Sequence, residues 1–208
     1  VKFLDTLHKK HHFNIIYSNT LAVLLGMIYA KKTKIKHIWH VHEIIVHPNI
    51  VANFFPKLLK KYADVVVCNS KATLENLLKR EPSLKSKAIV IYNGMITKEN
   101  YNTIDKEDLG FTNEDILVTL VGRISRLKGH KWLLNTYIKY LKNSNIKLLF
   151  VGSPVEGQEF YLKEIEQILI SNRLLDRVKI LQFTKQINPI FKVSDIIVTP
   201  STEAESFG

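Results

Sequence analysis

Two cationic side chains in one loop near the middle of the chain have the chemistry to bind a phosphorylated ligand. Arg123 and Lys128 lie between Gly122 and Gly129, in the pattern Gly-Arg-x4-Lys-Gly, directly after an apolar segment expected to form a strand. A guanidinium provides a planar fork of donors and an ammonium a compact charge, and both stabilise negative charge on a departing diphosphate. The alternative is a solvated basic turn. The position directly after a strand favours the ligand site.

Two further loops of suitable chemistry each follow an apolar segment later in the chain. The first carries Gly152 and Ser153, and the second carries Ser201 and Glu205. The carboxyl ends of parallel strands lie on one edge of an open α/β sheet, which is the edge where ligands bind. A serine hydroxyl, backbone N–H groups and a carboxylate suit a phosphorylated, hydroxyl-rich ligand. The sequence therefore predicts that these two loops and the Arg123 loop converge on one site.

Short apolar runs alternate with helical patterns along the whole chain, as is typical of parallel sheets covered by helices. A polar segment, residues 97–115, interrupts this alternation and is interpreted as a linker. We therefore expect two doubly wound, Rossmann-like α/β domains, residues 1–96 and residues 116–208. Strands are expected at residues 14–17, 37–41, 64–68, 88–92, 116–121, 147–151, 178–182 and 195–198, with helices such as residues 131–142 and 159–169 between them.

The composition is that of a basic globular protein. Of the 208 residues 46% are hydrophobic, and the formal net charge is +11. The charge would attract phosphorylated substrates, anionic lipid or nucleic acid. Nucleic acid is the least favoured of these, because the basic residues are scattered and no zinc-finger or RNP-type motif occurs. No apolar run reaches the roughly 18 residues of a membrane-spanning helix, so a cytoplasmic protein is expected.

One predicted helix, residues 52–62, combines a stripe of large apolar side chains with lysines. The stripe and its flanking cations are Phe54, Phe55, Leu58, Leu59 and Tyr62, beside Lys57, Lys60 and Lys61. This pattern is typical of a helix that lies on an anionic membrane, which would make the protein peripheral on the inner face of that membrane. A surface helix that packs inward on its own domain has the same pattern, and this second interpretation is favoured.

The histidines and the single cysteine complete no known catalytic or metal-binding spacing. His40 and His42 project from one face of an expected strand, but no Cys or Asp completes a zinc site, so we expect no metal and no cofactor. Cys68 lies in an apolar strand, where a packed small residue is commoner than a nucleophile. His130 is expected at the surface, at the start of a helix. The nucleotide-binding Gly-x-Gly-x-x-Gly and P-loop motifs and the hydrolase Gly-x-Ser-x-Gly motif are absent, which disfavours those enzyme classes.

The segment Pro200-Ser201-x3-Glu205-x-Phe207-Gly208 resembles the donor-site motif of retaining glycosyltransferases with the GT-B fold, specifically glycosyltransferase family 4. In that family the glutamate has a partner eight residues later, which is beyond the end of this sequence, and the resemblance implies that both domains are incomplete here. The Arg123 loop resembles the family's donor loop. Smaller matches follow the family's order along nearly the whole chain, at His40-Val-His42-Glu43, Val65-Val-Val-Cys-Asn-Ser70, Asn93-Gly94 and Val151-Gly152-Ser153.

The resemblance implies transfer of a sugar from a nucleotide-diphosphate sugar to an acceptor hydroxyl with retained configuration, in glycan or envelope polysaccharide synthesis. The donor would bind in a cleft between the domains without a metal, and the acceptor would be a glycan or a lipid-linked molecule. Arg123 and Lys128 would hold the diphosphate, Glu205 would touch the donor sugar, and His42 would face the reacting sugar. Further donor contacts would come from Gly122, Gly152, Ser153, Ser201, Phe207 and Gly208.

The sequence departs from the family pattern in two loops. Phe183-Thr184 stands where many relatives have a glycine, in a loop that lies against the nucleobase, so the base preference stays open. Gly152-Ser153-Pro154 also differs from the commoner Gly-x-Gly form. Two alternative functions remain: a nucleotide-sugar epimerase of the same fold, which would need no acceptor, and a non-catalytic binding or scaffold protein.

Overall fold

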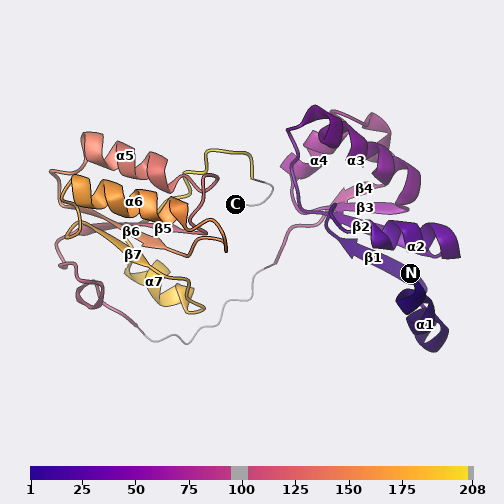
Figure 1. Cartoon of the computed structure of the whole chain (residues 1–208), viewed down its shortest axis with the longest axis horizontal. Coiled ribbons are helices and arrows are strands. Elements are labelled where there is room, and N and C mark those ends of the chain that lie inside the picture. Colours follow the sequence, from indigo (N-terminus) through magenta and orange to yellow (C-terminus); the bar gives the residue numbers. More distant parts are fainter. Residues whose placement is uncertain (95–102, 206–208) are drawn as a thin grey trace. The chain divides into compact units, whose positions relative to one another are not determined.

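The computed structural model describes residues 1–94 and 103–205, and its contacts divide the chain into two compact units, each built on a four-stranded parallel sheet (Figure 1). Among the described residues, 1–94 and 204–205 belong to the first unit and 103–203 to the second. The prediction of two parallel-sheet α/β domains is confirmed, and all eight strands that the sequence predicts are present. No helix in the described ranges is both long and apolar enough to cross a membrane.

The first unit has its strands in sequence order across the sheet. They are β1 (Ile15–Asn19), β2 (Lys36–Val41), β3 (Val65–Cys68) and β4 (Ala88–Val90), with helices α1 (Lys2–His11), α2 (Leu25–Thr33), α3 (Asn49–Tyr62) and α4 (Lys71–Leu78) and a 3₁₀ helix at Pro82–Ser86. Right-handed crossovers between strands in this order place the connecting helices on one face. Apolar side chains of α2, α3 and α4 accordingly share one core cluster with Trp39 and Cys68.

The second unit is wound in both directions from its central strand. Its elements are β5 (Ile116–Val121), α5 (His130–Tyr140), β6 (Ile146–Val151), α6 (Phe160–Ser171), β7 (Val178–Leu181), α7 (Ile187–Val193) and β8 (Ile196–Ile197), with the sheet order β7-β6-β5-β8. Since β8 returns to the free side of β5, α7 covers the face opposite α5 and α6. Two separate core clusters, one containing Leu134 and Ile165 and the other Ile190, fill the two faces.

The described part of the segment interpreted as a linker, residues 103–115, packs on the second unit. It contains a 3₁₀ helix at Glu107–Leu109, and Phe111 is buried in the α7-side core. The Lys106 ammonium donates to the Asp115 carbonyl at 2.6 Å and pairs with Asp195 at 2.7 Å. This segment therefore anchors the start of β5 to the start of β8.

Cys68 is fully buried at the end of β3, and burial raises the pKa of its thiol to about 11. Because only the thiolate is an effective nucleophile, we expect the native chain to react with a thiol reagent only as fast as it unfolds, whereas the denatured chain reacts at once. Absorbance of the released chromophore measures both rates. Fast labelling of the native chain would contradict this burial.

Candidate functional site

A cavity of about 480 Å³ opens at the carboxyl edge of the second unit's sheet. It lies where β5, β6 and β7 end, and two of the three loops that the sequence predicts at one site, those carrying Arg123 and Ser153, meet there. Ser201 and Glu205 of the third predicted loop are not in its lining. Its lining consists of Val121, Gly122, Arg123, Val151, Gly152, Ser153, Pro154, Phe183, Thr184 and Ile187. The apolar side chains come from strand ends, from α7 and, in the case of Pro154 and Phe183, from the loops, which also carry the polar groups.

Backbone rather than side chains forms the contact between the first two loops. The Gly122 N–H donates to the Val151 carbonyl at 2.9 Å, and the Gly152 N–H donates to the Leu181 carbonyl at 2.9 Å. Gly152 has φ +152°, and a Cβ placed on it would overlap the carbonyl oxygen of Gly122. Only glycine allows this approach. The loops can therefore present backbone groups directly to a ligand.

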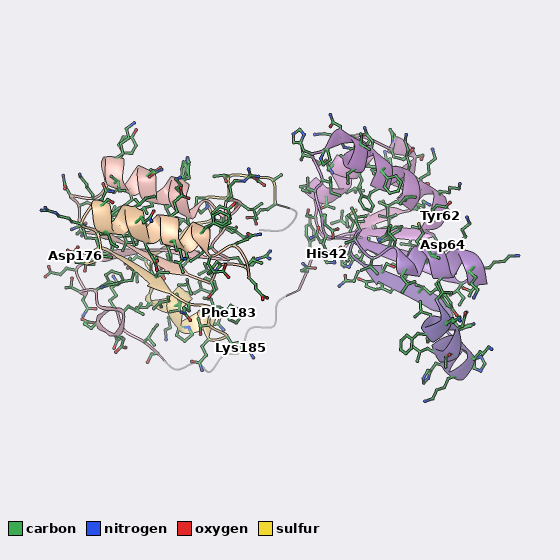
Figure 2. The ribbon with its side chains drawn as sticks, viewed as in Figure 1. His42, Tyr62, Asp64, Asp176, Phe183 and Lys185 are labelled. Carbon is green, nitrogen blue, oxygen red and sulfur yellow. The ribbon has the colours of Figure 1, made fainter. Side chains whose placement is uncertain are left out.

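The loop after β7 contributes an exposed aromatic ring to the cavity. Figure 2 shows Phe183 and Lys185 in the loop after β7, and the Phe183 side chain is 71% exposed although it lines the cavity. Its backbone N–H donates to the Ser153 hydroxyl oxygen at 3.0 Å, which fixes this loop to the loop after β6. The hydroxyl proton of Ser153 is left to donate elsewhere. A flat ring beside a cavity offers a surface on which a planar ligand group can stack.

The two predicted cations have different settings in their common loop. Arg123 is exposed and lines the cavity. Lys128 is half-buried, and its alkyl chain runs past Gly122, because a Cβ on that glycine would lie 3.3 Å from Lys128 Cδ. An exposed guanidinium and an ammonium whose alkyl chain is packed, both on one short loop, are suited to an anion with several phosphate oxygens.

The loop after β8 is hydrogen-bonded to the Arg123 loop at residues 126 and 127 of the latter. The Thr202 N–H donates to the Leu127 carbonyl at 2.9 Å, and the Thr202 hydroxyl donates to the Arg126 carbonyl at 2.9 Å. Arg126 also pairs with Glu203 at 2.5 Å. These bonds hold the segment around Ser201 beside the loop that carries Lys128.

Gly129 is needed at the same contact. It has φ +75°, and a Cβ on it would overlap the carbonyl oxygen of Pro200. Glu205 is half-buried. Phe207 and Gly208, which the sequence also predicts at the site, lie outside the described residues.

His130 does not lie at the surface, so that prediction is wrong. The side chain is 1% exposed, its ring packs edge-on against Phe150 at 5.2 Å, and neither ring nitrogen has a hydrogen-bond partner in the described part of the chain. Burial, and secondarily the charge of Lys128, lowers its pKa to about 4. His130 is the first residue of α5 and directly follows Gly129, and its side chain enters the core instead of facing solvent.

In the first unit, His42 lies in the loop after β2 (Figure 2), and its ring contacts Asn19 of β1. Its Nε2 is 2.7 Å from Asn19 Oδ1, and its ring centroid is 4.0 Å from that of His40. The Tyr17 hydroxyl contacts His40 Nδ1. Glu43 accepts from the His42 backbone N–H at 3.0 Å. The described residues contain no cluster of three His, Cys, Asp or Glu side chains that could hold a metal ion.

Two family models cover almost the whole chain. The model described as Glycosyl transferases group 1 matches residues 102–208, and the model described as Glycosyltransferase Family 4 matches residues 2–99. The chain is 29% identical over 127 residues to a Campylobacter jejuni protein named N-acetylgalactosamine-N,N'-diacetylbacillosaminyl-diphospho-undecaprenol 4-alpha-N-acetylgalactosaminyltransferase. That match covers 61% of this chain and 33% of the relative.

Solved structures with the same fold include glycosyltransferases of the GT-B type. The Anabaena protein HepE in complex with UDP and glucose superposes with a TM-score of 0.82 and 23% identity, over 99% of this chain and 57% of that one. Sucrose-phosphate synthase from Thermosynechococcus elongatus gives 0.78 and 20%, over 100% and 55%. The chain thus spans little more than half the length of these structures.

The Gly152 contact predicts a large difference between two glycine substitutions. Gly152→Ala should lower the free energy of unfolding by about 3 kcal/mol or more, since the new methyl overlaps a carbonyl oxygen at a strained φ. Gly157→Ala is the matched control, because Gly157 also has positive φ but its added Cβ would meet no atom within 4 Å. It should cost only about 1 kcal/mol. Urea denaturation measures both, and equal losses would show that the loop contact is not formed.

The buried His130 predicts a pH-dependent stability. An unfolded histidine titrates near 6.5, and the folded value is about 4, so between these pH values only the unfolded state binds the extra proton. The free energy of unfolding should therefore fall by about 3 kcal/mol as the pH drops from 6.5 to 4. His130→Leu should remove this part of the pH dependence, as measured by urea denaturation at several pH values. An unchanged slope in the variant would contradict the burial of a neutral imidazole.

Proposed function

The chain belongs to the glycosyl transferases group 1 family, and we propose that it transfers a sugar from a nucleotide-diphosphate donor to an acceptor hydroxyl. The observation that carries this proposal is the glycine-floored cavity at the carboxyl ends of β5, β6 and β7, with Arg123 in its lining. A volume of about 480 Å³ is in the range of small-molecule sites. The lining combines a basic loop for phosphates with an exposed aromatic ring for a base.

The cations act on the leaving group. Arg123 and Lys128 neutralise the charge that builds up on the nucleoside diphosphate as the bond from the anomeric carbon to the phosphate oxygen breaks. Such stabilisation is strongest where donors are held in place before the reaction. Lys128 meets this condition, because packing along Gly122 restricts its stem. A catalytic metal is not required in this scheme.

The stereochemical course is retention, by attack on the face from which the diphosphate leaves. The described residues lining the cavity include two hydroxyls, Ser153 and Thr184, but no carboxylate that could form a covalent glycosyl intermediate. A leaving phosphate oxygen then takes the proton of the incoming hydroxyl. Glu205 contacts the donor sugar, the segment at Ser201 offers backbone donors, and His42 lies on the acceptor side; these roles follow the family resemblance of their motifs.

The nucleobase stacks on Phe183. The ring is exposed, and the bond from its backbone to Ser153 fixes it beside the cavity. UDP sugars are the first donors to test, since the HepE complexes contain UDP or UDP-glucose. The Campylobacter relative, by its name, acts on a glycan linked to diphospho-undecaprenol. The proposed acceptor here is likewise a lipid-linked glycan of an envelope polysaccharide.

Donor binding should depend on two specific cations of the basic loop. At a hundredfold excess over its Kd, a ligand stabilises the folded state by about 2.7 kcal/mol, so a panel of UDP, GDP and ADP sugars should yield one clear rise in Tm. Arg123→Ala and Lys128→Ala should each weaken binding of that donor roughly 10- to 100-fold, because a charge-assisted bond to phosphate is lost.

Arg126→Ala is the matched control in the same loop. It removes one positive charge three residues from Arg123, but Arg126 is exposed and already paired with Glu203. Its donor affinity should stay within about twofold of the parent, since rim charges contribute little. If all three variants weaken binding equally, the effect is one of overall charge and the proposed diphosphate site is wrong. If no nucleotide sugar raises the Tm, donor binding itself is refuted.

A further inference from the structure

The helices α2 and α3 of the first unit carry exposed apolar and cationic side chains on their outward sides. They contact each other in the layer above the sheet, and both bury the side that faces the strands. On α3 the buried residues are Ala52, Pro56 and Leu59. On the opposite side, Ile50 is 84% exposed and Phe54 is 49% exposed. Two large apolar side chains of α3 are therefore exposed to solvent and do not pack in the core.

The outward residues of α3 change character along the helix. Ile50, Phe54, Lys57 and Lys61 are spaced by four, three and four residues, so they form one stripe along the helix. The first two are large and apolar, and the last two are cationic. The outward side of α2 repeats this order, with Ile28 half-exposed before Lys31. Both helices connect parallel strands and run in the same direction, so their apolar ends lie at the same edge of the unit.

The lysines at the other end are not neutralised by the protein. The Lys31 and Lys61 ammonium groups each lie 5.3 Å from the centroid of the Tyr62 ring, and they help to lower the pKa of that phenol. In the described part of the chain no ion pair joins Lys31, Lys57 or Lys61 to a carboxylate. Asp64, which lines a hollow with Lys31 and Lys61, is paired with Lys36 instead.

The charge of residues 1–94 favours an anionic partner. Residues 1–94 hold fifteen Lys and Arg against five Asp and Glu. Lysines in the last turn of a helix also offset its dipole, which accounts for Lys31 and Lys61. It does not account for Lys57 in mid-helix, nor for Ile50 and Phe54 on the same stripe. A basic stripe that continues an exposed apolar one fits a lipid bilayer, whose anionic headgroups overlie an apolar interior.

We propose that this face, formed by Ile28, Lys31, Ile50, Phe54, Lys57 and Lys61, docks on an anionic phospholipid membrane. The apolar ends of α2 and α3 enter the interface, and the lysines contact the headgroup phosphates. Both helices begin at the carboxyl edge of the sheet, where His42 and Asn19 lie, so docking brings that edge to the bilayer. The inference rests on the proposed function only in the role given to docking, which is to bring the site to a lipid-linked acceptor.

Vesicle sedimentation without any nucleotide sugar tests the surface separately from the donor site. The chain should bind vesicles of phosphatidylcholine mixed with phosphatidylglycerol, much less to phosphatidylcholine alone, and less at high salt because charges are screened. Lys57→Gln with Lys61→Gln should lower partitioning about 25-fold, from roughly fivefold per lysine. Ile50→Ser with Phe54→Ser should lower it at least about tenfold through lost apolar burial. Lys139→Gln with Lys142→Gln, on exposed lysines of the second unit, is the matched charge control and should change nothing.

Two results of the sedimentation experiment would overturn the proposal. One is equal loss of binding in the control pair, which would mean that net charge alone acts; the other is full binding by the Ile50 and Phe54 variant, which would exclude insertion. A second measurement covers variants that fold poorly. An environment-sensitive dye on Ile50→Cys should shift to shorter wavelength with anionic vesicles, whereas the same dye on Trp132→Cys in α5 should not. Cys68 does not interfere, since it is fully buried. Identical spectra at both positions would also refute docking by this face.

Discussion

The close backbone approach between Gly122 and Gly152 is the constraint on which the candidate site depends. Two adjacent parallel strands end there, and the loops that follow touch without side chains between them. This contact sets the floor of the cavity and holds Arg123 and Ser153 at its rim. It also leaves room for the Lys128 stem along Gly122. Because glycine has no side chain, the two loops can approach this closely, and backbone groups form the floor of the cavity.

A second glycine contact connects the site to the rest of the unit. Gly129 meets the backbone of Pro200, and the Thr202 bonds extend this meeting of the β5 and β8 loops. The next residue after Gly129, His130, lies in the core as a neutral ring. Because protonation of the buried ring is costly, the unit is expected to lose stability at acid pH. The turn at Gly129 therefore lies next to both the basic loop of the proposed site and the buried histidine that lowers stability at acid pH.

The two units handle charge in different ways. In the second unit Arg123 and Lys128 share one loop at the ligand edge, and Arg126 of the same loop is paired with Glu203. In the first unit the unpaired lysines lie on the outward side of α2 and α3, away from the strands. A concentrated charge suits a compact diphosphate, whereas a spread stripe with apolar neighbours suits an extended surface. The proposed donor site and the proposed membrane surface are therefore chemically separate.

The order of residues along the chain was enough to predict the two parallel sheets and the loops that end their strands. Apolar runs such as Ile116–Val121 have the length and the β-branched residues of a strand buried on both faces. In a parallel sheet, Gly-Arg or Gly-Ser directly after such a run lies at the carboxyl edge. These are local signals. The burial of His130, the bond from Phe183 to Ser153 and the outward turn of Ile50 depend instead on elements distant in sequence. Only packing decides which side of a helix faces the core, since a stripe of mixed apolar and basic residues has more than one solution in water.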